Sequence, residues 1–230
     1  GSGQVFQNCV KKISADQPAK TIEVLPGEAS ISDINITKAE LVTFDMLHVK
    51  NLSAKFDNVQ NISPVVNVQL PNISSERKSI NRFSLKGINE NYFSIKTLKL
   101  NKGRTFNSKD ANRKVIVLGY DVAKNLFNNV NCVGRLIFLN NVGYKIIGVT
   151  EKDNLFNNSG YNAYISYENA LNITSKTTFS EFILSLKAQV NTEEFQKTLQ
   201  VYLANKKGIN PKDKTAFFFN NIENTLKTIK

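Results

Sequence analysis

Residues 91–149 read NYFSIKTLKLNKGRTFNSKDANRKVIVLGYDVAKNLFNNVNCVGRLIFLNNVGYKIIGV, and this stretch decides how the chain folds. Glycines divide the stretch into short apolar strands and one helical segment; they stand at Gly103, Gly119, Gly134, Gly143 and Gly148. Their simplest role is structural, because glycine permits turns and close backbone approach without any ligand. The pattern therefore predicts a strand-rich unit rather than a phosphate-binding loop.

Two local signals give this unit its shape. Residues 135–139 and 144–149 are apolar runs on either side of Asn140 and Asn141, and asparagine tolerates the positive φ angles of a tight hairpin turn. Residues 121–127 have the pattern of a short helix that follows a strand ending at Gly119. We expect a hairpin and a helix packed together within the unit.

The segment before the block predicts helix, strand, helix and strand. An amphipathic helix is expected over 5–13, and a strand over 21–25 stops at Pro26 and Gly27. Thr37 and Glu40 have the spacing of a capping box. A helix with a buried stripe should follow it, and Pro64 should then open a strand over 65–70; the stripe comprises Leu41, Phe44, Leu47 and Val49.

The segment after the block repeats the order strand, helix, strand. Residues 181–187 alternate apolar and polar side chains, Asn191 and Glu194 form a capping pattern, and Gly208 ends the helix. A last strand is expected over 216–219. The fold class is therefore α+β: two βαβ-type halves carry an inserted strand-rich unit.

The order of the pieces in the block resembles the periplasmic core domain of MacB-type ABC transporter permeases. The likeness rests on a YF pair, a GRTF turn, a VIVLG strand, an AKNLF helix, a VGR hairpin and a closing IGV, at 92–93, 103–106, 115–119, 123–127, 133–135 and 147–149. TIEVLPG at 21–27 also resembles the strand and turn that follow the first membrane helix in this family. The likeness covers nearly the whole chain.

The resemblance implies a two-part domain. A porter-like subdomain would comprise residues 1–88 and 175–230, and a Sabre-like subdomain would be inserted at 89–174. The chain would lie between the first and second membrane helices of a cell (inner) membrane protein, on the periplasmic or extracytoplasmic side. The segment itself contains no apolar run of the roughly 18–20 residues that a membrane helix needs, and we expect it to be soluble alone.

The resemblance also implies partners. The full-length protein would be a homodimer that works with a membrane-fusion (adaptor) protein and an outer-membrane duct, and it would export an antibiotic, peptide or lipoprotein. Related permeases instead regulate or sense through a partner protein, so an extracytoplasmic sensing or regulatory domain stays open as an alternative. The neighbouring sequence would distinguish the two, because cargo does not follow from the fold.

The residues predict no chemistry within this segment. There is no glycine-rich phosphate loop for ATP, and His48, the one histidine, has no Cys or His at metal-ligand spacing. Cys9 and Cys132 form no CxxC pair, and two buried, unpaired thiols are preferred over a disulfide, which stays open. We therefore expect no catalytic residue, no cofactor and no metal, and the segment should not be an enzyme.

Because no chemistry is expected, the function of the segment should depend on the surfaces through which it contacts other molecules. The net charge of +11 is spread along the chain without arginine-rich blocks, which argues against a nucleic-acid partner. Residues 151–162 read as an exposed loop, and aromatic side chains on such a loop provide much contact area at small entropic cost. Phe156 and Tyr161 are the candidate partner-binding residues, although either could instead tuck under the loop.

Overall fold

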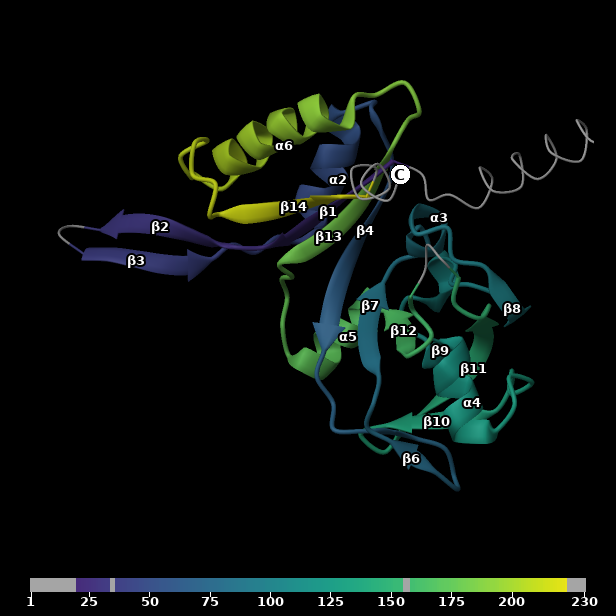
Figure 1. The fold of residues 1–230 in the computed structure, drawn as a ribbon. Helices are drawn as coiled ribbons and strands as arrows, with labels where there is room; N and C mark the ends of the chain where they lie inside the picture. The colour runs from purple at the N-terminus through teal and green to yellow at the C-terminus, as the bar shows by residue number, and fades with distance from the viewer. Residues whose placement is uncertain (1–19, 34–35, 155–157, 223–230) are drawn as a thin grey trace, which may run out of the picture.

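The computed structural model describes residues 20–33, 36–154 and 158–222, which form two joined parts and a projecting hairpin (Figure 1). The helices are α2 (Met46–Lys55), α3 (Tyr92–Ile95), α4 (Tyr120–Phe127), α5 (Tyr167–Thr174) and α6 (Thr192–Lys206). The strands are β1 (Thr21–Pro26), β2 (Glu28–Asp33), β3 (Ile36–Leu41), β4 (Val59–Val68), β5 (Ile73–Ser74), β6 (Ser79–Ile80), β7 (Ser84–Ile88), β8 (Leu100–Gly103), β9 (Val115–Leu118), β10 (Leu136–Leu139), β11 (Val142–Thr150), β12 (Asn162–Ser166), β13 (Glu181–Leu186) and β14 (Phe217–Asn221). The helix expected over 5–13 lies outside the described residues.

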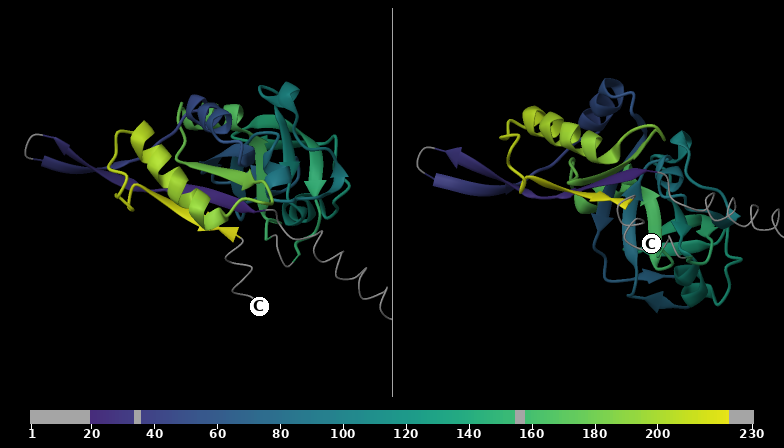
Figure 2. Two further views of the ribbon diagram at one scale, coloured as in Figure 1. Left: turned by 90° about the horizontal axis from the view of Figure 1, so that it is seen from above. Right: turned by 45° about the horizontal axis from the view of Figure 1, so that its top comes forward.

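One part, here called the four-stranded part, comprises β1, β4, β13 and β14 with α2 and α6. Its strands lie in the order β14-β1-β13-β4, and every neighbouring pair is antiparallel. This order, fourth, first, third, second along the chain, is that of a split βαβ arrangement. Both helices cover the same face of the sheet (Figures 1 and 2). The elements expected before and after the block are present, as β1, α2 and β4 and as β13, α6 and β14, and the two sets interleave in the sheet.

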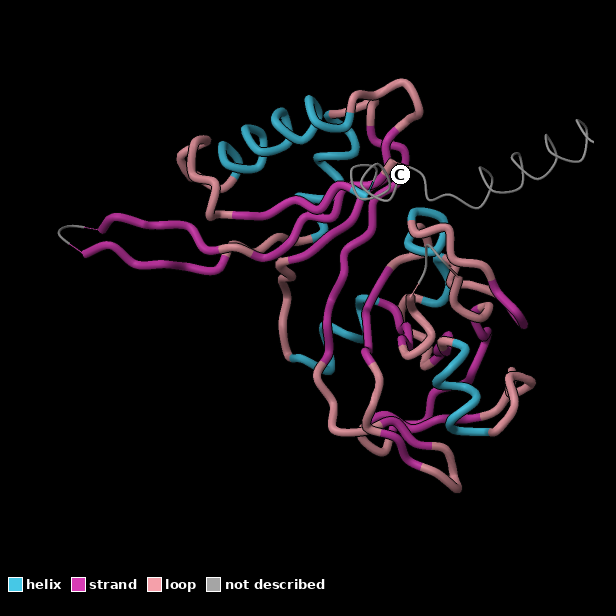
Figure 3. Tube along the Cα trace, in the orientation of Figure 1, coloured by secondary structure: helices cyan, strands magenta, loops and turns pink. Residues whose placement is uncertain are grey.

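The second part, here called the mixed part, continues the same sheet from β7 to β6 and includes α3, α4 and α5. β7 and β12 are parallel, β12 and β9 are antiparallel, and β9 and β11 are parallel again. The strands of both parts therefore belong to one mixed sheet. Figure 3 draws all strands in magenta, those of the separate β2–β3 hairpin included. The fold is α+β with a large mixed sheet.

The start of α2 corrects the sequence-based expectation. Thr37 and Glu40 do not cap a helix; they lie in β3, which pairs with β2. The chain stays extended as far as Phe44, because its backbone exchanges hydrogen bonds with Phe179 at 2.6 and 2.9 Å. The helix begins only after this bridge.

Asp45 is the residue that caps α2. Its side chain accepts from the backbone N–H of His48 at 3.0 Å, and the His48 Nδ1 accepts from the backbone N–H of Asp45 at 3.0 Å. This reciprocal pair is a capping box in which histidine takes the place of Glu or Gln. The later start also changes which side chains of the expected stripe are buried: Phe44 and Val49 are buried as expected, but Leu41 and Leu47 are 51% and 64% exposed.

Pro64 does not open β4 but lies inside it. The first part of the strand, Val59 to Val65, pairs with β13, and Val66 to Val68 pair with β7. Proline is confined to places in sheets where its missing N–H is not needed. Pro64 stands next to the point where β4 changes from one partner strand to the other. The same continuous strand therefore belongs to both parts.

The hairpin expected around Asn140 and Asn141 is confirmed. β10 and β11 pair in the register Leu139↔Val142, and both asparagines have positive φ, 48° and 63°. Two successive left-handed residues define the type I′ turn that matches the twist of the flanking strands. The helix expected over 121–127 is also confirmed as α4.

The GRTF turn at 103–106 packs tightly against β11. Gly103 has φ +79°, and a Cβ there would collide with the Ile147 carbonyl oxygen. The Arg104 guanidinium donates two hydrogen bonds, of 2.7 and 3.0 Å, to the buried carboxylate of Asp110. Phe106 then enters the core beside Phe93. The turn therefore combines a left-handed glycine with a charged pair and an aromatic anchor.

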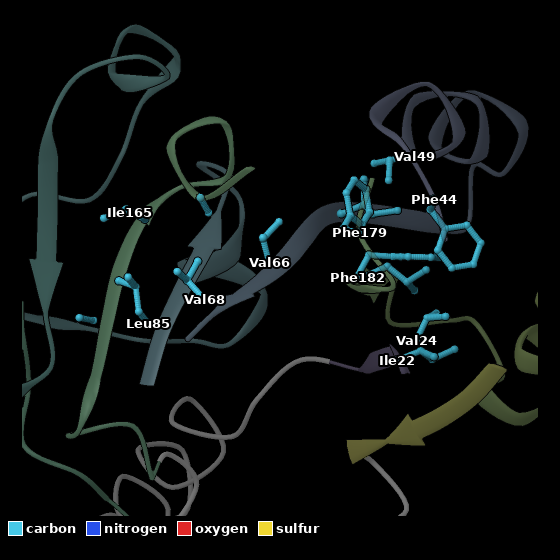
Figure 4. Packing of buried hydrophobic residues seen from close by; sticks show 14 of the residues in the cluster. Ile22, Val24, Phe44, Val49, Val66, Val68, Leu85, Ile165, Phe179 and Phe182 are labelled. Carbon is cyan, nitrogen blue, oxygen red and sulfur yellow. The ribbon is translucent and has the colours of Figure 1, made fainter. Parts of the chain in front are cut away.

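The hydrophobic core runs through both parts without a break. Ile22, Val24 and Phe182 pack under α2 with Phe44, while Val66, Val68, Leu85 and Ile165 continue the same cluster along β4 into the mixed part (Figure 4). A second cluster on the other side of the sheet includes Tyr92, Phe93 and Tyr164. Packing as well as strand pairing therefore joins the two parts.

The substitution Asp45→Ala should lower the free energy of unfolding by about 1 kcal/mol, because the His48 N–H in the first turn of α2 loses its side-chain acceptor. Urea denaturation followed by circular dichroism measures the change. The matched variant Thr37→Ala should cost less than about 0.5 kcal/mol, and a larger effect at Thr37 than at Asp45 would contradict this assignment of the cap.

The substitution Asp110→Asn should cost about 2 kcal/mol at neutral pH, because a charge-assisted pair with Arg104 is lost. The Arg104 hydrogen bonds hold the pKa of Asp110 below its ordinary value of 3.8. A lowered folded-state pKa means that the carboxylate stabilises the fold above pH 3.8 and that this stability is lost as the pH falls through the folded-state pKa.

The difference in unfolding free energy between wild type and Asp110→Asn should therefore be constant above about pH 5 and shrink below about pH 4. Urea denaturation across this range measures it, with exposed Asp57→Asn as the control. A difference that does not shrink in acid would show that the ion pair is not its source.

Candidate functional site

Of the two residues on the loop before β12 that are expected to bind a partner, the structure describes one. Phe156 belongs to residues 155–157, which lie outside the described residues. Tyr161 is half-buried, and its backbone carbonyl accepts from Ser84 N–H at 2.9 Å, which fixes the end of the loop to β7. The structure therefore places Tyr161 alone of the two aromatic residues.

Tyr161 lies under an arginine at the edge of a groove. The Arg82 guanidinium carbon is 4.1 Å from the centre of the Tyr161 ring, a cation–π contact, and Arg82 itself is exposed. The groove has a volume of about 600 Å³ and runs beside the β5–β6 hairpin past Pro71, Ile80 and Asn125. An aromatic ring that lies beneath an exposed guanidinium, in a wide polar groove, suits contact with a protein surface.

A second site lies at the junction between the two parts. A cavity of about 180 Å³ opens there between β1 and β13 of the four-stranded part and α3, β7 and β12 of the mixed part. Six of the side chains that line it are ionisable: Glu23, Lys86, Tyr92, Lys96, Tyr164 and Glu181. We call this group the junction network.

Ion pairs and hydrogen bonds cross the junction in two places. The Lys96 Nζ, at the end of α3, is 3.1 Å from the Glu23 Oε1 of β1. Lys86 of β7 donates to the Asn67 side chain at 3.0 Å, and Asn67 donates to the Glu181 carboxylate at 2.8 Å. Each chain of contacts therefore begins in the mixed part and ends on a carboxylate of the four-stranded part.

Burial shifts the acidities of groups in the junction network. Desolvation raises the pKa of Glu181 above its ordinary value, and nearby Glu23 adds to the effect. Desolvation likewise raises the pKa of Tyr92 well above 10.0 and that of Tyr164 to about 12. Both phenols therefore stay neutral at physiological pH, and the lysines provide the charge that balances the two carboxylates.

The remaining candidates have structural roles. His48 completes the α2 cap. Cys132 is buried, and desolvation raises the pKa of its thiol to about 11, so it is a poor nucleophile. Cys9 lies outside the described residues. Within the described ranges no group of three or more His, Cys, Asp or Glu side chains could hold a metal ion.

The sequence alone did not reveal the junction network. Its members are single charged residues in strands and one helix end, scattered from Glu23 to Glu181, and no local spacing relates them. One signal exists: Glu23 interrupts the apolar strand TIEVL, and a lone carboxylate in such a strand must find a partner. In the part of the chain that the structure describes, no helix is both long and apolar enough to cross a membrane.

Two solved structures share this fold. The periplasmic region of MacB from Actinobacillus actinomycetemcomitans aligns with a TM-score of 0.71 over 91% of this chain and 92% of that one, at 24% identity. The extracellular domain of the noncanonic ABC-type transporter YknZ from Gram-positive bacteria aligns with a TM-score of 0.67 over 87% of this chain and 100% of that one, at 18% identity. At these identities the likeness concerns the fold alone.

Relatives in sequence point the same way. The macrolide export ATP-binding/permease protein MacB of Aggregatibacter actinomycetemcomitans is 30% identical over 201 residues, which are 80% of this chain and 30% of that protein. A probable syringafactin export ATP-binding/permease protein, SyfD of Pseudomonas syringae pv. syringae, is 27% identical over 222 residues, 92% of this chain and 32% of that protein. The chain thus spans about a third of the length of these curated relatives.

A family model decides the assignment. The model of the MacB-like periplasmic core domain matches residues 2–202, well over half of the chain. The chain belongs to the MacB-like periplasmic core domain family.

Proposed function

We propose that this chain is the extracytoplasmic domain of a MacB-like ABC transporter permease that passes ATP-driven conformational change on to the export of a substrate, with an adaptor protein as partner. The observation that carries the proposal is the family match over residues 2–202. The relatives that share the domain are named as exporters of macrolides and of syringafactin. An antibiotic, a peptide or a lipoprotein is the class of cargo we propose here.

The topology supports an origin between two membrane helices. β1 and β14 are antiparallel neighbours in the register Ile22↔Asn221, so the chain enters β1 and leaves β14 at the same end of the sheet. Two membrane helices joined to these points would both run from that end toward one bilayer. We propose a cell (inner) membrane protein, homodimeric at full length, with ATP hydrolysed by another domain of the same protein.

We further propose the division into a porter-like subdomain, residues 1–88 and 175–230, and an inserted Sabre-like subdomain, residues 89–174. The four strands in split βαβ order all come from the first two ranges, and β8 to β12 come from the third. β5, β6 and β7 belong to the first range but pair within the mixed sheet. They would act as the connection through which movement passes.

The junction network gives that transmission a physical basis. Relative movement of the two parts has to break or rearrange the Glu23–Lys96 pair and the Lys86–Asn67–Glu181 relay. These groups are partly withdrawn from water, where unpaired charges are costly. We propose that the network holds the two parts in one orientation while the domain moves.

Lys96→Met in the full-length protein should lower ATP-driven export several-fold and leave ATP hydrolysis without cargo unchanged, because the orientation of the parts is loosened away from the ATP site. The same substitution in the isolated domain should cost about 1 kcal/mol of unfolding free energy. Reconstituted vesicles with coupled export and ATPase assays provide the measurement, and exposed Lys102→Met is the control.

Unchanged export by the Lys96→Met variant would show that the junction network takes no part in the proposed transmission of movement. ATP-dependent changes in a partner's activity without any movement of cargo would instead favour the sensing or regulatory alternative. Both readouts come from the same preparation.

Tyr161→Ala, alone and with Phe156→Ala, should weaken adaptor binding by about tenfold and act mainly on the dissociation rate, because buried aromatic contacts hold a formed complex. Biolayer interferometry with the adaptor encoded beside the transporter measures both rates. Phe218→Ala, which removes another aromatic ring that is 51% exposed, is the matched control. Equal rates for Tyr161→Ala and wild type would reject this groove as the docking surface.

A further inference from the structure

The cavity at the junction contains a buried hydroxyl group that has no partner within the described chain. Tyr92 is 5% exposed, and its ring packs against the rings of Phe93 and Tyr164 at centroid distances of 6.1 and 5.7 Å. The neighbouring Tyr164 hydroxyl accepts from the Asn162 side chain at 3.1 Å, but no described residue forms a hydrogen bond with the Tyr92 hydroxyl. Because the ring is fixed and lines the cavity, a molecule within the cavity is the partner that this hydroxyl can gain.

Charged groups at the same cavity also have unused hydrogen-bonding capacity. Among the described residues only Asn67 donates to the Glu181 carboxylate, at 2.8 Å, whereas a carboxylate can accept about four hydrogen bonds. The Lys96 Nζ donates to Glu23 at 3.1 Å and carries further N–H groups. The cavity therefore presents an acceptor, a donor and the Tyr92 phenol to whatever occupies it.

The charges at the cavity indicate a ligand without net charge. Glu23 and Glu181 face Lys86 and Lys96, so the lining is balanced, and a ligand with one net charge would disturb that balance. Glu181 nevertheless forms no ion pair within the described ranges, and desolvation raises its pKa above the ordinary value. An ammonium group beside this carboxylate would supply the missing cation, and a carboxylate on the same ligand would keep the sum at zero.

The volume and the apolar part of the lining limit the size of the ligand. The cavity measures about 180 Å³. An engineered protein cavity of about 150 Å³ holds benzene, and alanine has as many non-hydrogen atoms as benzene. Val65, Leu98 and Ile183 complete the lining and would receive a methyl group or a short alkyl chain. A larger molecule of the size of most drugs needs a pocket of roughly 300 Å³ or more.

We propose that the junction cavity is a binding site for a small zwitterion of the class of short-chain α-amino acids. The ammonium group of the ligand would lie beside Glu181, its carboxylate beside Lys96, and the Tyr92 hydroxyl would donate to that carboxylate. This binding does not depend on the proposed cargo or adaptor. It assigns a ligand to the side chains that hold the two parts together.

Such a ligand would favour the arrangement of the two parts that the structure shows. The lining comes from β1 and β13 of the four-stranded part and from α3, β7 and β12 of the mixed part. A molecule that contacts both parts binds best where the cavity has this shape, so it shifts the population toward that arrangement. Its effect on export rests on the proposed function, whereas its binding to the chain does not.

Isothermal titration calorimetry of the 230-residue chain with glycine, L-alanine and L-serine tests the binding. At least one of these zwitterions should bind saturably, one per chain, with a Kd of about 1 mM or tighter. Propionate and ethylamine, which each lack one charged group of alanine, should bind at least about tenfold more weakly. The melting temperature of the chain should rise with the concentration of the ligand that binds.

Two variants test the position of the ligand. Tyr92→Phe removes the hydroxyl and keeps the ring, and it should weaken binding by about tenfold. Its melting temperature without ligand should not fall, because no hydrogen bond within the protein is lost. Glu181→Gln keeps the shape and removes the charge, and it should weaken binding similarly. Tyr144→Phe is the matched control and should bind like wild type, because Tyr144 is also buried but does not line the cavity.

Three results would overturn the proposal. Absence of saturable binding by all three amino acids at about 10 mM would show that the cavity holds water alone. Equal affinity for alanine and for propionate or ethylamine would reject a zwitterion as the ligand. Wild-type affinity in Tyr92→Phe and Glu181→Gln would place the ligand elsewhere on the chain. None of these measurements involves cargo or adaptor, so each failure leaves the proposed function standing.

Discussion

The whole structure depends on one strand that serves two partners. β4 pairs with β13 through Val65 and with β7 from Val66, so its backbone is the point where the four-stranded part becomes the mixed part. Backbone groups buried in such a place must be paired, and only an extended strand can satisfy both sides at once. This explains why the strand expected over 65–70 begins earlier, at Val59. It also explains why Pro64 is tolerated within the strand.

Around this strand the protein uses two kinds of contact. Apolar side chains form a cluster that continues from Ile22 to Ile165 across both parts, and this burial supplies the larger share of stability. The junction network adds little net stability, because desolvation offsets much of the gain from each ion pair. We propose that its contribution is orientation, because the Glu23–Lys96 and Asn67–Lys86 contacts each join the four-stranded part to the mixed part.

Local signals predicted the elements that depend on local physics. Asn140 with Asn141, and Asn191 with Glu194, set a turn and a helix start through bonds within a few residues, and both are found as expected. The Thr37 and Glu40 pattern predicted a helix start, and this prediction is wrong. Both residues lie in β3, whose partner strand β2 has no sequence pattern typical of a strand. The junction network depends on pairings far apart in the chain: 73 residues separate Glu23 from Lys96, and 114 separate Asn67 from Glu181. The cation–π partner of Tyr161 is Arg82, a residue from another segment. No single-sequence spacing contains that information.

Bending of the domain between its two parts is limited by the contacts that bending would break. Bending between the parts is easiest near Pro64, where the ladder changes partner and the proline has no N–H to lose. The same point is braced from the side: Asn89 donates its backbone N–H to the Ser63 hydroxyl at 3.1 Å and its side-chain amide to the Ile62 carbonyl at 3.0 Å. Bending there would break these bonds, open the continuous core and separate the charges of the junction network together. Because one bending movement would incur all of these costs together, we expect the two parts to resist partial bending about Pro64.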